Sequence, residues 1–358
     1  MLDDQTVSTT LLLLIITAFF VIILERVGRN KQTKMMNTSC EQKLEHCCDD
    51  NNPIGDSTNL DAVDSLLCAN CGKGEEESSK LKSCNACKEV QYCNRDCQLA
   101  HWPMHKKACK KRAAELHEEK LFKQPPPPEE CALCFLILED GSNTETFKSC
   151  CGKLICNGCI YAMKISEGKD LCPFCRKPRP KAREVIEQVK KLMDNRNAYA
   201  FNVLANFYED GDLGLPQNYQ KARELYLRGG ELGCAGSYYN LAKFYRLGIG
   251  VRMDVKKAQH YAELAAMNGG KQARHNLGCM ELSAGNIQRG YKHFIIAARA
   301  GFDTSLDNVK HGFKIGFVTK EEYDSTLHAY HEHLNEMKSE MRDKAASYYI
   351  AGGFSKNW

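Results

Sequence analysis

The sequence feature that most constrains this chain is a crowding of cysteines between residues 68 and 175. Fifteen of its twenty cysteines lie in that interval, most of them in pairs separated by two residues. Such pairs can form disulfides in small secreted proteins, but repeated Cys-x-x-Cys pairs with a His-x-x-x-Cys segment in a 358-residue chain suit zinc better. We therefore expect a reducing compartment and two compact segments that metal ions hold together.

The length and the net charge of the chain limit how many domains it can form and which partners it can bind. With 358 residues there is room for two or three domains. The formal net charge of +4 is small for this length, so nothing in it points to a nucleic-acid partner. No His-Glu-x-x-His motif is present, which argues against a zinc hydrolase.

An uncharged, apolar stretch at residues 5–24 is long enough to cross a bilayer. Acidic residues precede it, so it does not resemble a signal peptide, and it has no polar face that a buried core helix would show. Four basic residues follow it: Arg26, Arg29, Lys31 and Lys34. Positive charge favours the cytosolic side, so we expect a single-pass transmembrane anchor with its basic flank over residues 1–34, and the zinc modules and repeats in the cytosol. A disordered tether would follow over residues 35–66.

The first cysteine-rich module is expected over residues 67–110, and it offers eight metal ligands for two tetrahedral zinc ions. The ligand candidates are Cys68, Cys71, Cys84, Cys87, Cys93, Cys97, His105 and Cys109. The segment QYCNRDCQLAHWPMHKKAC resembles the MYND zinc finger. That resemblance implies interleaved ligands, with the first and third cysteine pairs on one zinc and the other four ligands on the second. It also implies His105 rather than His101 as the histidine ligand, and a shallow groove near Trp102 for proline-containing peptides.

A helix and a proline-rich linker, QPPPPEE, are expected over residues 111–130, ahead of the second module at residues 131–176. That module again has eight candidates: Cys131, Cys134, Cys150, Cys151, Cys156, Cys159, Cys172 and Cys175. The segments CALCFLILED, CCGKLICNGC and LCPFCRKPRP resemble an all-cysteine RING finger. The resemblance implies two more zinc ions with interleaved ligands. RING fingers separate the third and fourth ligands, whereas Cys150 and Cys151 are adjacent, so the role of Cys150 stays open.

The RING resemblance also implies a partner. Such a domain recruits a ubiquitin-conjugating enzyme and acts by positioning, without chemistry at the metal or a catalytic residue of its own. The matching contact surface is Leu133 with Pro173 and Phe174, and Arg176 matches the cation that bridges enzyme and ubiquitin.

The last part of the chain repeats itself. LANFYEDGDLG, LAKFYRLGIGV and LGCMELSAG begin at Leu204, Leu241 and Leu277, and each is followed by a second stretch with helical periodicity. This pattern predicts an all-α solenoid and resembles Sel-one-like repeats, relatives of tetratricopeptide repeats. We place a connecting helix at residues 177–196, the repeats at 197–302 and capping helices at 303–358. Glycines at positions 229, 230, 233, 269, 270 and 301 are expected to end helices.

The sequence thus predicts a multi-domain protein, with a transmembrane helix, two zinc-stabilised modules and a C-terminal helical solenoid. The leading functional hypothesis is a membrane-anchored RING-type ubiquitin ligase, with the finger and the repeats as protein-interaction modules. The alternative is an adaptor that binds proteins through the same modules and catalyses nothing.

Overall fold

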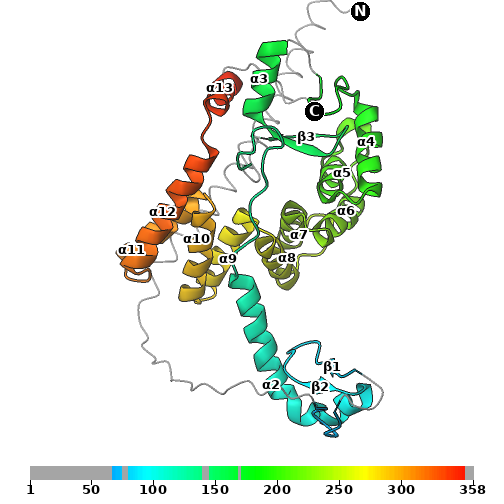
Figure 1. The fold of residues 1–358 in the computed structure, drawn as a ribbon, viewed down its shortest axis with the longest axis vertical. Helices are drawn as coiled ribbons and strands as arrows, with labels where there is room; N and C mark the ends of the chain where they lie inside the picture. Colours follow the sequence, from blue (N-terminus) through cyan, green and yellow to red (C-terminus); the bar gives the residue numbers. More distant parts are fainter. Residues whose placement is uncertain (1–66, 75–79, 139–144, 168–170, 351–358) are drawn as a thin grey trace, which may run out of the picture.

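The computed structural model describes residues 67–74, 80–138, 145–167 and 171–350. A curved row of helices forms its body, and the first cysteine-rich module stands apart from that body at the far end of helix α2 (Figure 1). The second module lies at the opposite end of the molecule, beside helices α4 and α13 (Figure 1).

The first module combines a short hairpin with a long helix. Strands β1 (Lys82–Ser83) and β2 (Gln91–Tyr92) pair in antiparallel orientation, and α2 (Arg95–Phe122) follows. Asn94 caps the helix, because its side-chain oxygen accepts a hydrogen bond from the Cys97 amide at 2.9 Å. Helix α2 carries the last three candidate ligands, Cys97, His105 and Cys109, and continues beyond Cys109 to the solenoid.

The second module has the same layout on a larger scale. Strands β3 (Glu145–Lys148) and β4 (Lys153–Cys156) form an antiparallel hairpin, with Glu145 opposite Cys156, and α3 (Asn157–Glu167) follows. Its small core consists of Cys131, Leu138, Ile155 and Cys156. A core of this size supplies little burial, so a module of this kind depends on metal for much of its stability.

The solenoid is built from helices that pack in sequential antiparallel pairs, as the repeat pattern predicts. Its helices are α4 (Ala182–Asp194), α5 (Ala198–Asp210), α6 (Tyr219–Glu231), α7 (Ala235–Leu247), α8 (Val255–Met267), α9 (Lys271–Ser283) and α10 (Ile287–Arg299), with a short 3₁₀ helix η3 (Asp212–Gly214) after α5. Small residues let paired helices approach closely. A Cβ added to Gly278 would lie 2.6 Å from a ring carbon of Phe294.

The six glycines fall into three groups, and this corrects the expectation that all six end helices. Gly270 is the N-cap of α9 and so precedes a helix. Gly233, Gly269 and Gly301 have positive φ angles of 102°, 95° and 78° and lie in the turns after helices. Gly229 and Gly230 lie inside α6 instead, where they are buried. Their missing side chains leave space for Ser237 and Tyr238 of α7, so close packing rather than helix termination explains them.

Three helices complete the described chain: α11 (Asp303–Lys314), α12 (Lys320–Met337) and α13 (Glu340–Ile350). Thr319 and Glu322 form a capping box at the start of α12, with the Glu322 amide donating to Thr319 Oγ1 at 3.2 Å. Helices α11 and α12 pack against α10, but α13 leaves the solenoid and packs against α3 of the second module (Figure 1).

Among the described residues, none of the helices combines the length and the apolar character that crossing a membrane requires. The anchor predicted over residues 5–24 and the tether predicted over residues 35–66 lie outside the described residues.

Candidate metal centres

One backbone turn recurs four times and positions the ligands of both cysteine-rich modules. Each turn begins at the first cysteine of a Cys-x-x-Cys pair, and the residue after the second cysteine has a positive φ. These residues are Gly72, Lys88, Phe135 and Arg176, with φ of 70°, 60°, 58° and 56°. The amide of each donates a hydrogen bond of 2.9 to 3.0 Å to the carbonyl oxygen of the first cysteine. This closed turn points both sulfurs of a pair to the same side.

The first cluster consists of Cys68, Cys71, Cys93 and Cys97, whose sulfurs all lie within 4.8 Å of one another. The sulfurs of Cys71 and Cys93 are 3.8 Å apart, and those of Cys93 and Cys97 are 3.4 Å apart. With Zn–S bonds of about 2.3 Å, a tetrahedral site has sulfur–sulfur edges of about 3.8 Å. A disulfide would need about 2.05 Å, so the spacing suits zinc and not a bridge.

The second cluster consists of Cys84, Cys87, His105 and Cys109, and all four residues are buried. The sulfurs of Cys84 and Cys109 are 3.7 Å apart, and His105 Nε2 lies 3.4 Å from the Cys87 sulfur. The competing histidine, His101, is directed elsewhere: its Nδ1 lies 3.1 Å from the hydroxyl of Tyr92. The structure therefore places His105 in the cluster, and the first module has the interleaved arrangement.

The third cluster brings together Cys131, Cys134, Cys156 and Cys159 in the second module. The sulfurs of Cys131 and Cys159 are 3.9 Å apart, and those of Cys134 and Cys156 are 3.7 Å apart. These distances again match the edges of a tetrahedral ZnS₄ site.

The fourth cluster is a set of three: Cys150, Cys151 and Cys172, with 3.7 Å between the sulfurs of Cys151 and Cys172. Cys175 is outside this set, although it belongs to the same Cys-x-x-Cys turn as Cys172. The adjacent pair, which departs from RING spacing, thus contributes both of its sulfurs. Not every sulfur of this set lies within 4.8 Å of the Cys175 sulfur, but the side chain of Cys175 interacts with those of Cys150 and Cys172 and remains the candidate for a fourth ligand.

Each cluster contains one thiol that ionises easily. Burial raises the pKa of each of these thiols, but backbone amides that donate to the sulfur outweigh it. The resulting pKa is about 6 for Cys68 and Cys84 and about 7 for Cys131 and Cys172. These are the first cysteines of the four turns. Each cluster therefore offers one thiolate near neutral pH to begin metal capture, and the remaining thiols lose their protons as the metal binds.

Comparison with known families identifies two of the three parts of the chain. Residues 68–109 match the model of the MYND finger. Residues 198–234, 235–270 and 272–302 match the model of the Sel1 repeat. The chain therefore contains a MYND finger and a Sel1 solenoid, both of which are protein-interaction modules. The RING-like character of the second module depends on its own cysteine clusters.

The curated relatives match this chain over short stretches that are a small part of their own length. "SET domain and MYND-type zinc finger protein 6" of Schizosaccharomyces pombe is 41% identical over 69 residues, which are 17% of this chain and 14% of that protein. "Zinc finger MYND domain-containing protein 10 homolog" of Drosophila melanogaster is 48% identical over 44 residues, 12% of this chain and 9% of that protein. Among solved structures, a Sel1 repeat protein from Oxalobacter formigenes matches with a TM-score of 0.38 and 20% identity, covering 49% of this chain and 71% of that one.

The residues proposed for partner contact in the second module differ in exposure. Phe174 is 37% exposed and Arg176 is also exposed, whereas Pro173 is half-buried. Leu133 is half-buried as well, and it packs against the core of its own module. Of the three apolar residues of the predicted contact surface, Leu133 is therefore the one that also belongs to the core of its own module. The left-handed backbone of Arg176 follows from its place in the turn after Cys175.

Sequence reasoning missed Arg342, a residue of α13 that reaches the third cluster. Its guanidinium donates to the carbonyl oxygens of Ile137 at 2.7 Å and Leu136 at 3.2 Å, and it lies 3.9 Å from the Cys134 sulfur. More than two hundred residues separate Arg342 from these partners, so no local pattern could indicate the contact. A positive charge here compensates the negative charge that four thiolates and one zinc ion leave.

Proposed function

We propose that this chain is a zinc-dependent ubiquitin ligase of the RING type, in which the MYND finger and the Sel1 solenoid select the proteins to be modified. The observation that carries the proposal is the arrangement of the second module. Two cysteine clusters interleave along residues 131–175, and they hold the loops of Leu133 and Phe174 next to metal ligands. Such an arrangement keeps a contact surface rigid without a large core, and a rigid surface is all that positioning of a conjugating enzyme requires.

The MYND finger supplies a further contact surface. Three large apolar side chains of α2 are exposed: Leu99 at 59%, Trp102 at 39% and Met104 at 83%. Exposed apolar residues next to a rigid metal site are typical of a protein-binding surface. We assign this surface to a protein or peptide partner, in keeping with the groove that MYND fingers use.

The ligase proposal is tested with the full chain in a mild non-ionic detergent. The chain is combined with ubiquitin, activating enzyme and a panel of conjugating enzymes, and ubiquitin chains are detected by immunoblotting. We expect chain formation with at least one conjugating enzyme. Cys156→Ser should abolish it because the third cluster is lost, and Arg176→Ala should reduce it while zinc content stays unchanged. If the unmodified, zinc-loaded chain forms no ubiquitin chains with any conjugating enzyme, the ligase proposal is wrong.

A non-enzymatic adaptor is the second candidate, and the packing of the second module favours it. Leu133 is partly buried in its own core, and α13 covers part of α3. Both contacts reduce the surface that a conjugating enzyme could use. The adaptor predicts that no conjugating enzyme shifts the NMR signals around Phe174, and that Arg176→Ala changes no binding partner.

The membrane anchor is part of the same proposal. Residues 5–24 would hold the chain to a membrane as a single pass, with the zinc modules and solenoid on the cytosolic side. Alkaline carbonate should fail to extract the full chain from cell membranes but should extract a variant that lacks residues 1–34. Extraction of both forms alike would contradict the anchor.

A further inference from the structure

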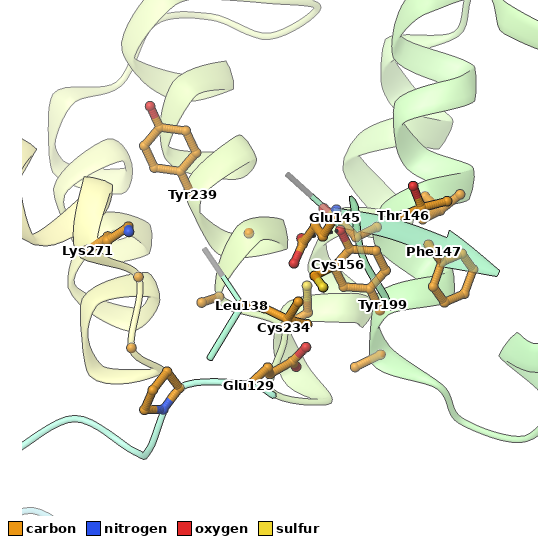
Figure 2. A pocket seen from close by; sticks show the side chains of 18 of the residues that line it. Glu129, Leu138, Glu145, Thr146, Phe147, Cys156, Tyr199, Cys234, Tyr239 and Lys271 are labelled. Carbon is orange, nitrogen blue, oxygen red and sulfur yellow. Dashed lines mark hydrogen bonds between the residues drawn. The ribbon is translucent and has the colours of Figure 1, made fainter. Parts of the chain in front are cut away.

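A cavity of about 2340 Å³ lies between the solenoid, the proline-rich linker and the second module. Helices α5, α7 and α9 line one wall, and strand β3 lines another (Figure 2). Pro125 to Pro128 run along a third part, close to the turn before α9, where a Cβ added to Gly269 would lie 3.6 Å from Pro126. Pockets for small molecules measure roughly 300 to 1,000 Å³, so this space is better suited to a peptide segment.

Lys271, a cation in the wall of the cavity, has no counter-ion among the residues that the structure describes. Lys271 is only 7% exposed, and it forms no hydrogen bond or ion pair with any residue in the described part of the chain. Figure 2 shows its side chain extending from α9 toward the middle of the cavity. Burying an ammonium group without a partner costs free energy, and an anion bound in the cavity would remove that cost.

The backbone around Lys271 also favours a bound anion. Lys271 is the first residue of α9, a helix of 13 residues, and its N-cap is Gly270, which offers no side chain to cap the helix. Lys271, Gln272 and Ala273 all line the cavity. The amides of the first helical turn have no partner within the helix, and the helix dipole makes this end positive. An uncapped helix start and the unpaired ammonium of a buried lysine thus meet at one point of the wall.

We propose that this point of the cavity binds a side-chain carboxylate of an acidic peptide segment, held by the Lys271 ammonium and the first amides of α9. The wall of the cavity carries both acidic residues, such as Glu129 and Glu145, and basic ones, such as Arg299. At the start of α9 a single ammonium is unpaired, and the one negative charge of a carboxylate matches it better than the two charges of a phosphate. The linker prolines show that an extended backbone can lie along this wall. The inference extends the proposed role of the Sel1 solenoid as a partner-binding module, and it does not depend on ligase activity.

The test uses a fluorescein-labelled peptide of six glutamates, with a peptide of six glutamines as its neutral counterpart, and follows fluorescence anisotropy with the full chain in detergent. We expect the glutamate peptide to bind and the glutamine peptide not to bind. Lys271→Met should weaken binding at least about tenfold, because a charge-assisted contact is lost. Lys271→Arg should retain part of it. The matched control is Lys256→Gln, which removes an exposed lysine near the start of α8 and should leave binding unchanged.

A second readout locates the contact. A carbodiimide joins a carboxylate to an amine that touches it, so mass spectrometry should find the glutamate peptide linked to Lys271. Equal affinity of the unmodified chain and Lys271→Met, with circular dichroism showing both folded, would overturn the proposal. Absence of binding by the unmodified chain would do the same. Inorganic phosphate that displaces the peptide at equal charge concentration would show a general anion site and would also overturn it. Ligase activity is measured separately, so each proposal can fail alone.

Discussion

At the scale of single residues, the four cysteine turns share a conformation that L-amino acids adopt at a cost. Only one turn places a glycine at the left-handed position, Gly72, whereas Lys88, Phe135 and Arg176 accept the strain. Two explanations are open for these three residues: their side chains have a role outside the turn, or metal binding offsets the free-energy cost of the left-handed backbone. Gly72 offers a direct measurement of this cost, because a Cβ at that position would meet no atom within 4 Å.

Gly72→Ala should weaken the first cluster by backbone strain alone. A left-handed alanine costs about 1 kcal/mol, which corresponds to about fivefold weaker zinc retention if metal binding and folding of the finger are one process. Competition with a chromophoric chelator measures the zinc affinity of both forms. Lys88→Gly is the reciprocal control, because it relieves the same strain in the second cluster and should not accelerate zinc release. Equal retention in the unmodified chain and in Gly72→Ala would show that the turn is not strained.

Arg342→Met tests whether α13 supports the third cluster. The change removes the donors to Ile137 and Leu136 and the positive charge near Cys134. Loss of such an outer contact typically costs about 10 to 100-fold in metal affinity. We expect chelators to remove zinc faster from the second module, with the MYND finger unaffected. Arg183→Met, at an arginine side chain that is 94% exposed, serves as the control. If both variants release zinc at the same rate, Arg342 has no part in metal retention.

At the scale of elements, one buried arginine connects the MYND finger to the solenoid. Arg274 of α9 is 2% exposed, and its guanidinium donates to Leu121 O at 2.5 Å and to Ala266 O at 2.9 Å. These carbonyls lie in the last turns of α2 and α8, where few amides of the same helix remain to bond them; the Ala266 oxygen also accepts from the Gly269 amide at 3.2 Å. The position of the finger relative to the solenoid thus depends on a cap that two helices share.

Arg274→Met should destabilise this junction by about 1 to 3 kcal/mol, because the Leu121 carbonyl loses its donor and the Ala266 carbonyl keeps only backbone amides. Urea unfolding followed by circular dichroism measures the loss. Limited proteolysis should also cut the linker after α2 faster, since the helix end is released. Arg228→Met removes an exposed arginine that pairs with Glu231, and it should change stability by less than about 1 kcal/mol. Unchanged proteolysis of Arg274→Met would mean that other contacts position α2.

The same junction shows where sequence reasoning reaches its limit. Sequence patterns sufficed for the repeats and for the first three cysteine clusters, because a repeated segment and the spacing of ligands can be read directly along the chain. Arg274 and Leu121 are 153 residues apart, and a single arginine in a helical stretch gives no sign that it will be buried. The packing of α13 on the second module was missed for the same reason. Contacts between elements distant in sequence depend on the complete fold.

At the scale of the whole molecule, the solenoid connects both metal modules. Helix α2 brings the MYND finger to α8, and α13 returns from the end of the solenoid to the second module (Figure 1). A change in solenoid stability should therefore reach both modules. The solenoid contains two buried histidines that make such a change dependent on pH, His275 and His293.

Burial lowers the pKa of both imidazoles. It lowers that of His275 to about 4, and together with the charges of Arg274 and Arg289 it lowers that of His293 to about 3. The ring of His275 bonds Ser305 through Nδ1 at 2.8 Å, whereas both nitrogens of His293 lack a hydrogen-bond partner among the described residues. The unfolded chain protonates histidine near pH 6.5, but the folded chain does not until pH 4 to 3. Above pH 6.5 both states are neutral at these sites and stability is unaffected. Below it, stability falls with pH.

At pH 5 each histidine should reduce the free energy of unfolding by about 2 kcal/mol relative to pH 7. Urea unfolding of the solenoid at pH 7, 6 and 5 measures the slope. His293→Leu should reduce that slope by about half, because an apolar side chain needs no partner there, and comparison at equal pH cancels any loss of zinc from the metal modules. His328→Leu, at a side chain that is 74% exposed and pairs with Glu332, should leave the slope unchanged. Identical slopes in the unmodified chain and His293→Leu would show that His293 takes up its proton as readily in the folded solenoid as in the unfolded chain.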